Sequence, residues 1–536
     1  MMHPADEAPW RAANAANAVD AAVVAVARCD SARAAVHFGG RILSYGDLDR
    51  LADQVACAIA RVTTPGTRIA YLGRNSDSCL VLLLAAMRTG TCLVPVNWRL
   101  SAQEIAFVLA DSEAQWLFVE PEFAPHHVPG GTGAGTGPAG VILSDGLATL
   151  TGWAAAQAAA GQGAASLPPY DPAAGFVQLY TSGTTGFPKG VVITNERYSI
   201  HVARLGADPA RWWIGTRAQD VVLVAMPMFH VSGCGIALEA LAVGATIVLL
   251  PAFDAPGILH AIGAHRVTRI FLVPAALRIV LELPAVATAD LRCLETLMYG
   301  GSPITPDLQA LADRHLRCRF VHCYGMTEAG GNICVLEQRC DDPEVLRASV
   351  GRAIPGTEVR IADPSGRVLP AGFKGEVQLR SPTTFAGYWH NPAATTDAYT
   401  ADGWMHTGDI GYQDDTGHLF LLDRLGDLII SGGENIYPVE VERLLALHDD
   451  IADVAVIGLD HPHWGQVVTA CVVPRSGATL TLAAIHEWLD GRLARYKLPR
   501  VLHVTDLLPR NAAGKVRRAA LREALAEARH VASITD

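Results

Sequence analysis

Short apolar runs and amphipathic stretches alternate along the first part of the chain. The runs RIAYLG, TCLVPV and QWLFVE are typical of strands, whereas LDRLADQVACAIARV and SAQEIAFVLADS have helical spacing. This alternation over residues 20–121 therefore predicts βα units that cover a sheet. Residues 126–169 are rich in Gly, Ala and Pro, so we expect a surface excursion there, with at most a strand at GVILS.

The alternation of strands and helices returns after Pro169. The runs VVLVAM, ATIVLL, RIFLV and TLMYGG predict further strands with helices between them. Short strands and turns over residues 351–422 predict a β-rich subdomain, and a compact α+β pattern follows Arg424. We expect an α/β fold, with a large N-terminal domain of βα-layered subdomains plus the β-rich subdomain (1–424) and a small α+β C-terminal domain (428–536).

Length and composition narrow the classes of function. The chain has 536 residues, which predicts more than one domain, and its formal net charge of −11 disfavours a nucleic-acid partner. The N-terminus has no basic segment followed by an apolar one, so we expect a cytoplasmic protein. The apolar window 235–253 is interrupted by Glu239, and it predicts a buried helix followed by a core strand rather than a transmembrane segment.

Two possible sites are rejected on their spacing. Four potential zinc ligands at residues 315–323 fit no zinc motif, and the apolar pair between them is typical of a buried strand. GTGPAG, residues 135–140, matches GxGxxG but lacks the preceding strand and following helix of a dinucleotide site. The eleven cysteines form no CxxC pair, which favours reduced thiols buried as small hydrophobic residues.

The stretch YTSGTTGFPKGV, residues 180–191, points to a phosphate. It is not a P-loop, because Pro188 stands where the second glycine should be and Gly190 follows the lysine. Its glycines permit a close backbone approach to a polyanion, its hydroxyls can donate to phosphate oxygens, and Lys189 adds positive charge. An ordinary polar hairpin would not need so many donors. The predicted phosphate-binding residues are Thr181, Ser182, Gly183, Thr184, Thr185, Gly186 and Lys189.

This loop resembles the phosphate loop of the adenylate-forming superfamily, which includes acyl-CoA synthetases, adenylation domains of peptide synthetases and beetle luciferases. Further motifs follow in the family's order: PMFHVSG, MYGGSP, YGMTEAG, GEVQLRSPTTFAGYW, GWMHTGDIG, DRLGDLIISGGENIYPVEVE and PRNAAGK. The resemblance spans nearly the whole chain, and NWRL adds a weaker similarity to fatty-acyl-CoA synthetases. It implies that a carboxylate attacks the α-phosphorus of ATP to give an acyl-adenylate and pyrophosphate, after which CoA takes the acyl group.

The resemblance also implies roles at the reacting phosphates. Glu328 would hold Mg²⁺, a hard cation that prefers oxygen ligands, and Thr327 would donate to the α-phosphate. Lys515, in the turn after PRNAAG, matches the adenylation lysine, whose ammonium would stabilise the transition state. We expect Lys515→Ala to abolish adenylation.

By the same resemblance, Tyr324 packs on adenine and Asp409 accepts hydrogen bonds from the ribose hydroxyls. Arg424 lies nearby as a second contact. The nucleotide-binding positions implied are Gly301, Ser302, Tyr324, Gly325, Asp409 and Arg424.

The second half-reaction is implied to depend on a mobile C-terminal domain. The hinge would be residues 425–427, where Gly426 replaces the Lys or Asp that is usual in the family. Gly432 and Gly433 would let the pantetheine of CoA pass, with Glu434 near the reacting centre. No carrier-protein domain follows Lys515, which favours free CoA as the acceptor.

The acid would enter past His230, which could also contact the carboxylate. The implied pocket residues are His230, Ser232, Gly300, Gly301, Ser302 and Cys323, where Cys323 replaces a glycine and would narrow the tunnel. We see no fixed counter-ion in this set, so we expect an apolar carboxylic acid and take a fatty acid as the leading substrate.

Several alternatives stay open. An aromatic or alicyclic acid could replace the fatty acid, and a carrier protein could replace CoA. A luciferase-like oxygenase has no positive support, and Glu328 and Lys515 together argue against a silent nucleotide-binding regulator. The oligomeric state, with a homo-oligomer among the alternatives, and the pathway cannot be derived from the sequence.

Overall fold

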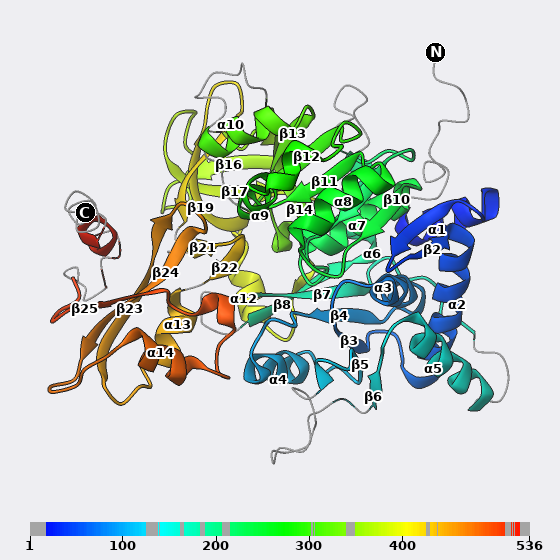
Figure 1. Cartoon of the computed structure of the whole chain (residues 1–536), viewed down its shortest axis with the longest axis horizontal. Coiled ribbons are helices and arrows are strands. Elements are labelled where there is room, and N and C mark those ends of the chain that lie inside the picture. The colour runs from blue at the N-terminus through cyan, green and yellow to red at the C-terminus, as the bar shows by residue number, and fades with distance from the viewer. Residues whose placement is uncertain are drawn as a thin grey trace.

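The computed structural model describes residues 18–124, 138, 140–160, 166–182, 188–205, 215–301, 304, 306–338, 349–424, 429–436, 438–509, 516, 518 and 520–525. A large N-terminal body contains two big sheets and a smaller one, and a C-terminal α+β part lies beside it (Figure 1). The large N-terminal and smaller C-terminal domains of the predicted α/β fold are confirmed.

The first big sheet has seven strands in the described chain, in the order β18-β8-β7-β4-β3-β5-β6. The strands β7, β4, β3, β5 and β6 run parallel, and β8 returns antiparallel to β7. Their bounds are β3 (Arg68–Leu72), β4 (Cys92–Val96), β5 (Trp116–Val119), β6 (Gly140–Leu143), β7 (Gly175–Ser182), β8 (Pro188–Thr194) and β18 (Gly387–Tyr388).

The second big sheet has nine strands among the described residues, in the order β15-β14-β13-β12-β11-β9-β10-β1-β2. The six strands from β13 to β1 run parallel, and antiparallel strands complete both edges. Their bounds are β1 (Ala34–Phe38), β2 (Arg41–Ser44), β9 (Val221–Val224), β10 (Thr246–Leu249), β11 (Arg269–Leu272), β12 (Thr296–Gly300), β13 (Arg319–Met326), β14 (Gly331–Gln338) and β15 (Arg352–Ala353).

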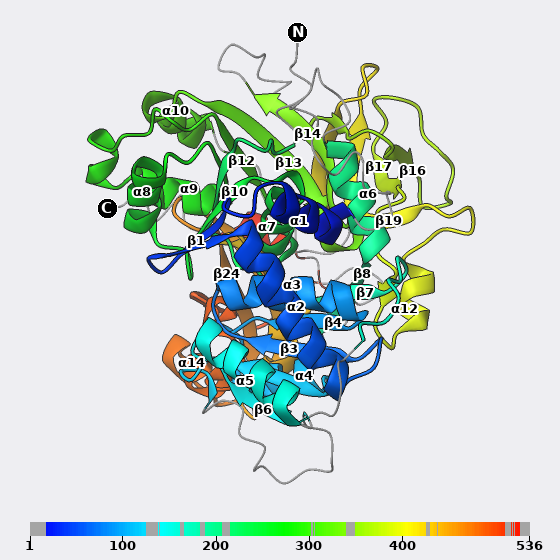
Figure 2. The same cartoon turned by 90° about the vertical axis from the view of Figure 1, so that its right-hand side faces the viewer.

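Helices fill the space between the two big sheets. In Figure 2, α3 (Asp77–Thr89) and α7 (Val231–Val243) lie between them, and α3 is buried along its whole length. One hydrophobic core joins residues of these helices to both sheets, as Val36 of β1 and Leu93 of β4 illustrate. The other helices of this body are α1 (Ala18–Cys29), α2 (Tyr45–Val62), α4 (Ala102–Asp111), α5 (Leu147–Ala160), α6 (Asn195–Leu205), α8 (Ala255–His265), α9 (Pro274–Leu281), α10 (Pro306–His315) and α12 (Pro392–Asp397).

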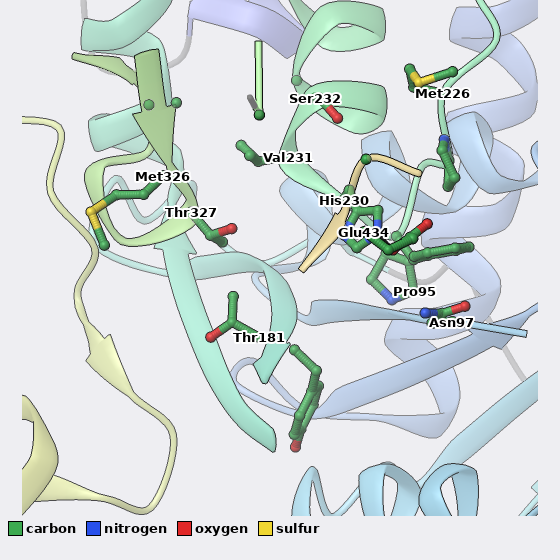
Figure 3. Close-up of a pocket in the computed structure, with 18 of the residues that line it drawn as sticks. Pro95, Asn97, Thr181, Met226, His230, Val231, Ser232, Met326, Thr327 and Glu434 are labelled. Carbon is green, nitrogen blue, oxygen red and sulfur yellow. Dashed lines mark hydrogen bonds and ion pairs between the residues drawn. The ribbon is translucent and has the colours of Figure 1, made fainter. Parts of the chain in front are cut away.

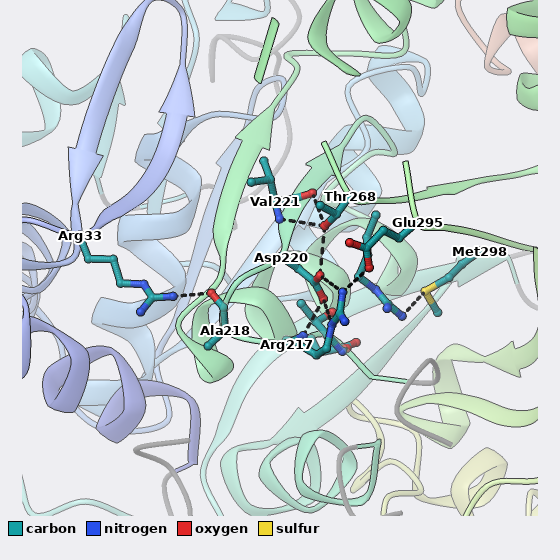
Figure 4. A network of polar contacts seen from close by, with 11 residues as sticks. Arg33, Arg217, Ala218, Asp220, Val221, Thr268, Glu295 and Met298 are labelled. Atoms are coloured by element: carbon teal, nitrogen blue, oxygen red, sulfur yellow. Dashed lines mark hydrogen bonds and ion pairs between the residues drawn. The ribbon is translucent and has the colours of Figure 1, made fainter. Parts of the chain in front are cut away.

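A polar network ties together the starts of three parallel strands of the second sheet (Figure 4). Arg217 donates to Asp220 at 2.7 Å and to Glu295 at 2.5 Å, and the Thr268 hydroxyl donates to Asp220 at 3.1 Å. These residues precede β9, β11 and β12, and the Val221 amide donates to Thr268. This network fixes the strand register at the amino ends. The carboxyl ends, where ligands bind in α/β sheets, carry none of these contacts.

The remaining sheets are antiparallel or mixed. The β-rich subdomain pairs β16 (Glu358–Ala362), β17 (Gly375–Arg380), β19 (Met405–Gln413) and β20 (Leu419–Arg424). The C-terminal sheet has the order β22-β21-β24-β23, with β25 on β24. Its elements are β21 (Ile429–Ser431), β22 (Glu434–Ile436), α13 (Pro438–Leu445), β23 (Ile451–His461), β24 (Gly465–Pro474), α14 (Leu482–Leu489) and β25 (Val501–Val504).

One segment differs from the sequence prediction. Part of the 126–169 segment is regular: GVILS forms the edge strand β6, and α5 buries Leu147, Leu150 and Ala154 against α2. Its Ala-rich sequence masked the helix, because alanine is helix-forming but gives almost no amphipathic signal. Gly432 and Gly433 form the turn of the β21–β22 hairpin, and Glu434 begins β22.

Other predicted features are found as expected or lie outside the described residues. The apolar window 235–253 is most of the helix α7 followed by the strand β10, and among the described residues no helix combines the length and apolarity that a bilayer crossing requires. His322, in the rejected zinc cluster, stacks on Tyr299 with ring centroids 4.8 Å apart. The hinge 425–427 and most of GTGPAG lie outside the described chain.

Arg88 of α3 offers a test of the helical packing. Its buried guanidinium bonds to Asp20, Asp49 and Asp53 at 2.7 Å each. We expect Arg88→Met to lower stability by about 3–5 kcal/mol, because it leaves carboxylates at a buried site without their counter-charge. Urea denaturation measures this. Arg292→Met, at an arginine that is 90% exposed, is the matched control, and equal midpoints for both variants would contradict the role of Arg88.

Candidate active site

A cavity of about 1340 Å³ lies where the carboxyl ends of the parallel strands meet the C-terminal domain. Segments directly after β9, β11, β12 and β4 line it, together with the arms of the β7–β8 hairpin. The β21–β22 hairpin and the segment around Tyr496 line it from the C-terminal side. Such a crevice at the carboxyl ends of parallel strands is the usual position of a ligand site in α/β sheets.

The predicted phosphate loop joins two strands that line the cavity. Thr181 of β7 pairs in register with Lys189 of β8, and both line the cavity. The Lys189 ammonium lies 5.0 Å from the centroid of the Tyr388 ring. Ser182 ends β7, and the tip residues Gly183, Thr184, Thr185 and Gly186 lie outside the described chain.

Glu328 and Thr327 enter the cavity from a tight turn that follows β13. The 3₁₀ turn Thr327–Ala329 ends at Gly330, whose φ of 74° lies in the left-handed region that favours glycine. Thr181 and Tyr388 donate their hydroxyls to the same Glu328 oxygen, at 3.3 and 3.0 Å. Figure 3 shows Thr181, on β7, and Thr327, in the turn that follows β13. A carboxylate among hydroxyl oxygens is a donor set that fits Mg²⁺, which prefers oxygen ligands and phosphates.

Tyr324 and Asp409 are bonded to each other behind the cavity wall. The Tyr324 hydroxyl donates to Asp409 at 2.6 Å, and both side chains are buried. Burial and then the Asp409 charge raise the pKa of Tyr324 well above its usual value. The cavity is lined instead by the adjacent Gly325 and Gly408. Tyr324 therefore does not present its ring to the cavity here, as the adenine role would require.

Asp409 also faces Arg424 in the strand register of β19 and β20. These two positions, 15 residues apart in sequence, are thus paired across two strands, and their ribose role stays a prediction. Lys515, the predicted adenylation lysine, lies outside the described residues.

Glu434 connects the C-terminal domain to the centre of the cavity. It forms an ion pair with Arg99 and a hydrogen bond with His230, the latter at 3.3 Å (Figure 3). Burial would raise the pKa of Glu434, but the hydrogen bond and charge of His230 and the charge of Arg99 lower it to about 2. Glu434 is therefore ionised at neutral pH. His230 is held at the position that precedes the first turn of α7.

The two glycines before Glu434 let the hairpin approach closely. Gly433 has a φ of 82°, and a Cβ there would lie 2.4 Å from Val273 Cγ2. Gly432 has a φ of 60°, and a Cβ there would lie 3.1 Å from the Trp464 ring. Only glycine therefore allows this tip to pack against β11's end in the present arrangement.

The predicted acid pocket is partly as expected. Ser232, Gly301 and Cys323 line the cavity, and burial raises the pKa of the Cys323 thiol to about 12, so the thiol stays protonated. Gly300 does not line it, and a Cβ there would lie 2.4 Å from the Cys323 carbonyl oxygen. Ser302 lies outside the described chain. The apolar wall comes from Ile236, Phe271, Val273, Ala276, Ile279 and Met298.

Sequence reasoning missed several residues of the site. Tyr388 and Arg99 stand within motifs that were recognised, but no role was assigned to them. Tyr496 and Lys497 give no local signal, because their partners Asn97, Glu104 and Glu440 are all distant in sequence. Asn97 donates to Tyr496 at 3.5 Å, and Lys497 bonds to Glu104 at 2.8 Å and to Glu440 at 2.5 Å.

Two parts of the chain match known protein families. Residues 23–389 match the AMP-binding enzyme family, and residues 440–515 match the AMP-binding enzyme C-terminal domain. The chain belongs to the AMP-binding enzyme family. The resemblance to adenylate-forming enzymes is thereby confirmed, and the predicted use of ATP, Mg²⁺ and CoA is that of acyl-CoA ligases in this family.

Relatives of known activity cover most of this AMP-binding enzyme. A fatty acid–[acyl-carrier-protein] ligase, ScoC, from Streptomyces coeruleorubidus is 36% identical over 90% of this chain and 92% of its own length. An indoleacetate–CoA ligase from Aromatoleum aromaticum is 37% identical over 92% of this chain and 95% of its own. The protein is an AMP-forming ligase that joins a carboxylic acid to a thiol of CoA or of a carrier protein.

Two solved structures of o-succinylbenzoate CoA synthetase from Bacillus subtilis share the fold of this AMP-binding enzyme. Each is 27% identical and covers 96% of this chain and 98% of its own. A double mutant bound to the product analogue OSB-NCoA gives a TM-score of 0.79. The complex with the acyl-adenylate OSB-AMP gives 0.64. The arrangement described here is thus more similar to the first.

Proposed function

We propose that the protein is an AMP-forming acyl-CoA ligase for a carboxylic acid with an apolar body, a fatty acid being the first candidate. The observation that carries the proposal is the layout of the cavity. The Thr181–Glu328–Tyr388 cluster lies toward one side, the apolar pocket begins at Ser232, and His230 stands near the start of that pocket. A phosphate subsite and an acid subsite in one cavity match the joining of an acid to a nucleotide.

The phosphate side neutralises charge as the acid attacks. Glu328 would hold Mg²⁺, which when bound withdraws charge from the phosphate oxygens. Thr181 and Tyr388 orient the Glu328 carboxylate through their hydroxyls. Lys189 and the loop residues 181–186 would bind the outer phosphates, Thr327 the α-phosphate, and Lys515 would stabilise the transition state between the two anionic reactants.

Burial positions the acid for attack. The apolar wall removes water from the acid body, while His230, at the start of α7, would stand beside the carboxylate. Holding two reactants in one orientation converts a bimolecular step into an effectively unimolecular one. A mobile acid in water would not gain this advantage.

The C-terminal domain stands in an arrangement suited to the thioester step. The greater similarity to the product-analogue complex than to the acyl-adenylate complex of the same synthetase supports this assignment. The hairpin tip Gly432–Gly433 and Glu434 reach the cavity here, as a loop beside the entering thiol would. We infer that the domain rotates about residues 425–427 between the two half-reactions.

A carrier protein as thiol donor is the second candidate. The 36% identity to a fatty acid–[acyl-carrier-protein] ligase favours it, whereas the indoleacetate–CoA ligase at 37% favours CoA. An aromatic acid is likewise favoured by the second relative.

Mass spectrometry of the purified protein with MgATP and a panel of straight-chain, aromatic and polycyclic acids tests the function. We expect acyl-CoA and AMP to accumulate with CoA present and the preferred acid to be identified. Acyl-adenylate that forms but gives thioester only with an acyl carrier protein would instead establish the second candidate. Heat-inactivated protein is the control.

The metal role of Glu328 is tested by Glu328→Gln. Glutamine still accepts the two hydroxyl bonds, so we expect unchanged thermal stability but roughly 100-fold slower pyrophosphate release and a higher Mg²⁺ requirement. A magnesium titration of pyrophosphate release measures both. The same change at the exposed Glu358 is the control. Wild-type Mg²⁺ dependence in Glu328→Gln would rule out the assigned role.

The domain arrangement is tested by Glu104→Gln, which removes the charge that α4 offers to Lys497. Glutamine can preserve the reciprocal cap with Ser101. Loss of a charge-assisted bond of about 1.5–3 kcal/mol should reduce the population of this arrangement roughly 10- to 100-fold. We therefore expect thioester formation to slow by that factor while single-turnover pyrophosphate release stays within about twofold.

Rapid-quench measurement separates these two steps. Glu487→Gln, at an exposed residue of α14, serves as the control. If both half-reactions of Glu104→Gln slow equally, the contact does not select between arrangements.

A further inference from the structure

The cavity continues inward beyond Ser232, between α6 and α7. Gly235, Ile236 and Glu239 line it from α7, and Tyr198 and His201 line it from α6. Gly331 and Asn332 at the start of β14 close this end. The inner end therefore carries an imidazole, a carboxyl and an amide, in contrast to the apolar wall before it.

One face of α7 connects the reacting end to this inner end. Ser232, Gly235 or Ile236, and Glu239 recur at helical spacing, which places them on the same side of the helix. His230 stands at the start of α7, and nine residues of helix span roughly 13 Å at about 1.5 Å per residue. Glu239 thus marks the position that the far end of an extended acid would reach.

His201 is a buried polar side chain that faces this space. It is 5% exposed, and its Nδ1 has no hydrogen-bond partner within the described structure. A Cβ at position 331 would lie 2.9 Å from its Cε1 and Nε2, so this ring edge packs directly against Gly331. Burial and then the Arg204 charge lower the pKa of His201 to about 4. The ring is neutral at pH 7 and offers one donor and one acceptor.

Glu239 completes the polar end from the opposite helix. It is 6% exposed, and one of its oxygens accepts the Thr216 amide at 2.7 Å. Burial raises the pKa of Glu239, and the Arg269 charge opposes this. The Tyr198 hydroxyl is already used, because it donates to the Gly235 carbonyl. His201, Glu239 and the Asn332 amide are therefore the groups able to bond to a ligand.

We propose that this inner end binds an uncharged oxygen group, a hydroxyl or a carbonyl, at the far end of the carboxylic acid. The inference rests on the proposed function, since it concerns the acid that the same cavity activates. It narrows the substrate class from plain apolar acids to acids with an apolar body and an oxygen substituent at the end opposite the carboxylate. His201 and Glu239 are the specificity-determining residues.

A charged group at that end of the acid is disfavoured by the surroundings. A second carboxylate would face Glu239, and an ammonium would lie near the guanidinium groups of Arg204 and Arg269, which act on His201 and Glu239 respectively. Like charges in a buried site repel strongly. A neutral group that both donates and accepts fits an imidazole and a carboxyl best.

Matched pairs of acids test the inference with the wild-type protein. We would compare decanoic with 10-hydroxydecanoic acid, and 3-phenylpropionic with 3-(4-hydroxyphenyl)propionic acid, by kcat/KM for AMP release. We expect the hydroxylated member of at least one pair to be favoured by at least about tenfold, because a site built to bond a hydroxyl rejects the analogue that lacks it. Equal or lower values for both hydroxylated acids would overturn the inference.

The variant His201→Phe locates the preference. We expect the hydroxyl preference to fall to about one, with Glu239→Gln as a conservative second variant should the first not fold. The same exchange at the exposed His260 should leave the preference unchanged. A preference that persists in a folded His201→Phe protein would contradict the role of His201. Activation of plain acids without any hydroxyl preference would refute this inference alone, whereas no AMP from any acid would refute the proposed function itself.

Discussion

A single buried ammonium fixes where the C-terminal domain sits. Lys497 is 2% exposed, and its Nζ is bonded to Glu104 of α4 and to Glu440 of α13. A buried ammonium without counter-charges would be strongly unfavourable, so both carboxylates must stay in place. Glu104 belongs to the N-terminal domain and Glu440 to the C-terminal domain. Because Lys497 needs both carboxylates, it sets the position of the C-terminal sheet. Tyr496, Trp464 and Glu434 reach the cavity only as a result.

This contact contains two carboxylates and one cation, which makes it sensitive to protonation. Burial raises the pKa of Glu440 to about 7, with Lys497 opposing and Glu104 adding to the rise. Because its pKa is raised in the folded state, Glu440 favours folding in its protonated form, and this contribution is lost as pH rises through the folded value. At neutral pH the ionised Glu440 is therefore costly to bury, and the Lys497 charge offsets part of that cost.

The topology explains why the chemistry gathers at one end of the sheets. The Arg217–Asp220–Thr268 network joins the amino ends of β9 and β11, and the turns after their carboxyl ends supply His230 and Val273. The apolar runs predicted that strands and helices alternate, but they did not predict the order of the strands in each sheet. The motifs at the strand ends could also be predicted, because the glycines and hydroxyl side chains of each motif lie within a few residues of one another. The cluster of Thr181 with Glu328 follows from that local information plus the resemblance.

Contacts between distant segments were not readable. Glu104 illustrates the reason: the sequence predicts its helix, and one carboxylate oxygen caps that helix through Ser101, but the other oxygen binds a lysine 393 residues away. Tyr324 was assigned a ring contact, yet its hydroxyl donates to Asp409, 85 residues on. No periodicity or motif encodes such pairings, which arise only when the sheets are assembled.

The polar inner end of the acid pocket has an energetic consequence for the reacting end. A buried polar atom without a partner, such as His201 Nδ1, costs about 1–3 kcal/mol in the ligand-free protein. An acid that bonds to this end recovers part of that free energy far from its carboxylate. Binding energy from such a remote group can hold the carboxylate against the α-phosphate. It then lowers the activation barrier of adenylation, rather than only the KM for the acid. His230 stands at the start of α7, and Glu239 lies farther along the same helix. An acid whose oxygen group is bound at the inner end is therefore also held with its carboxylate beside His230.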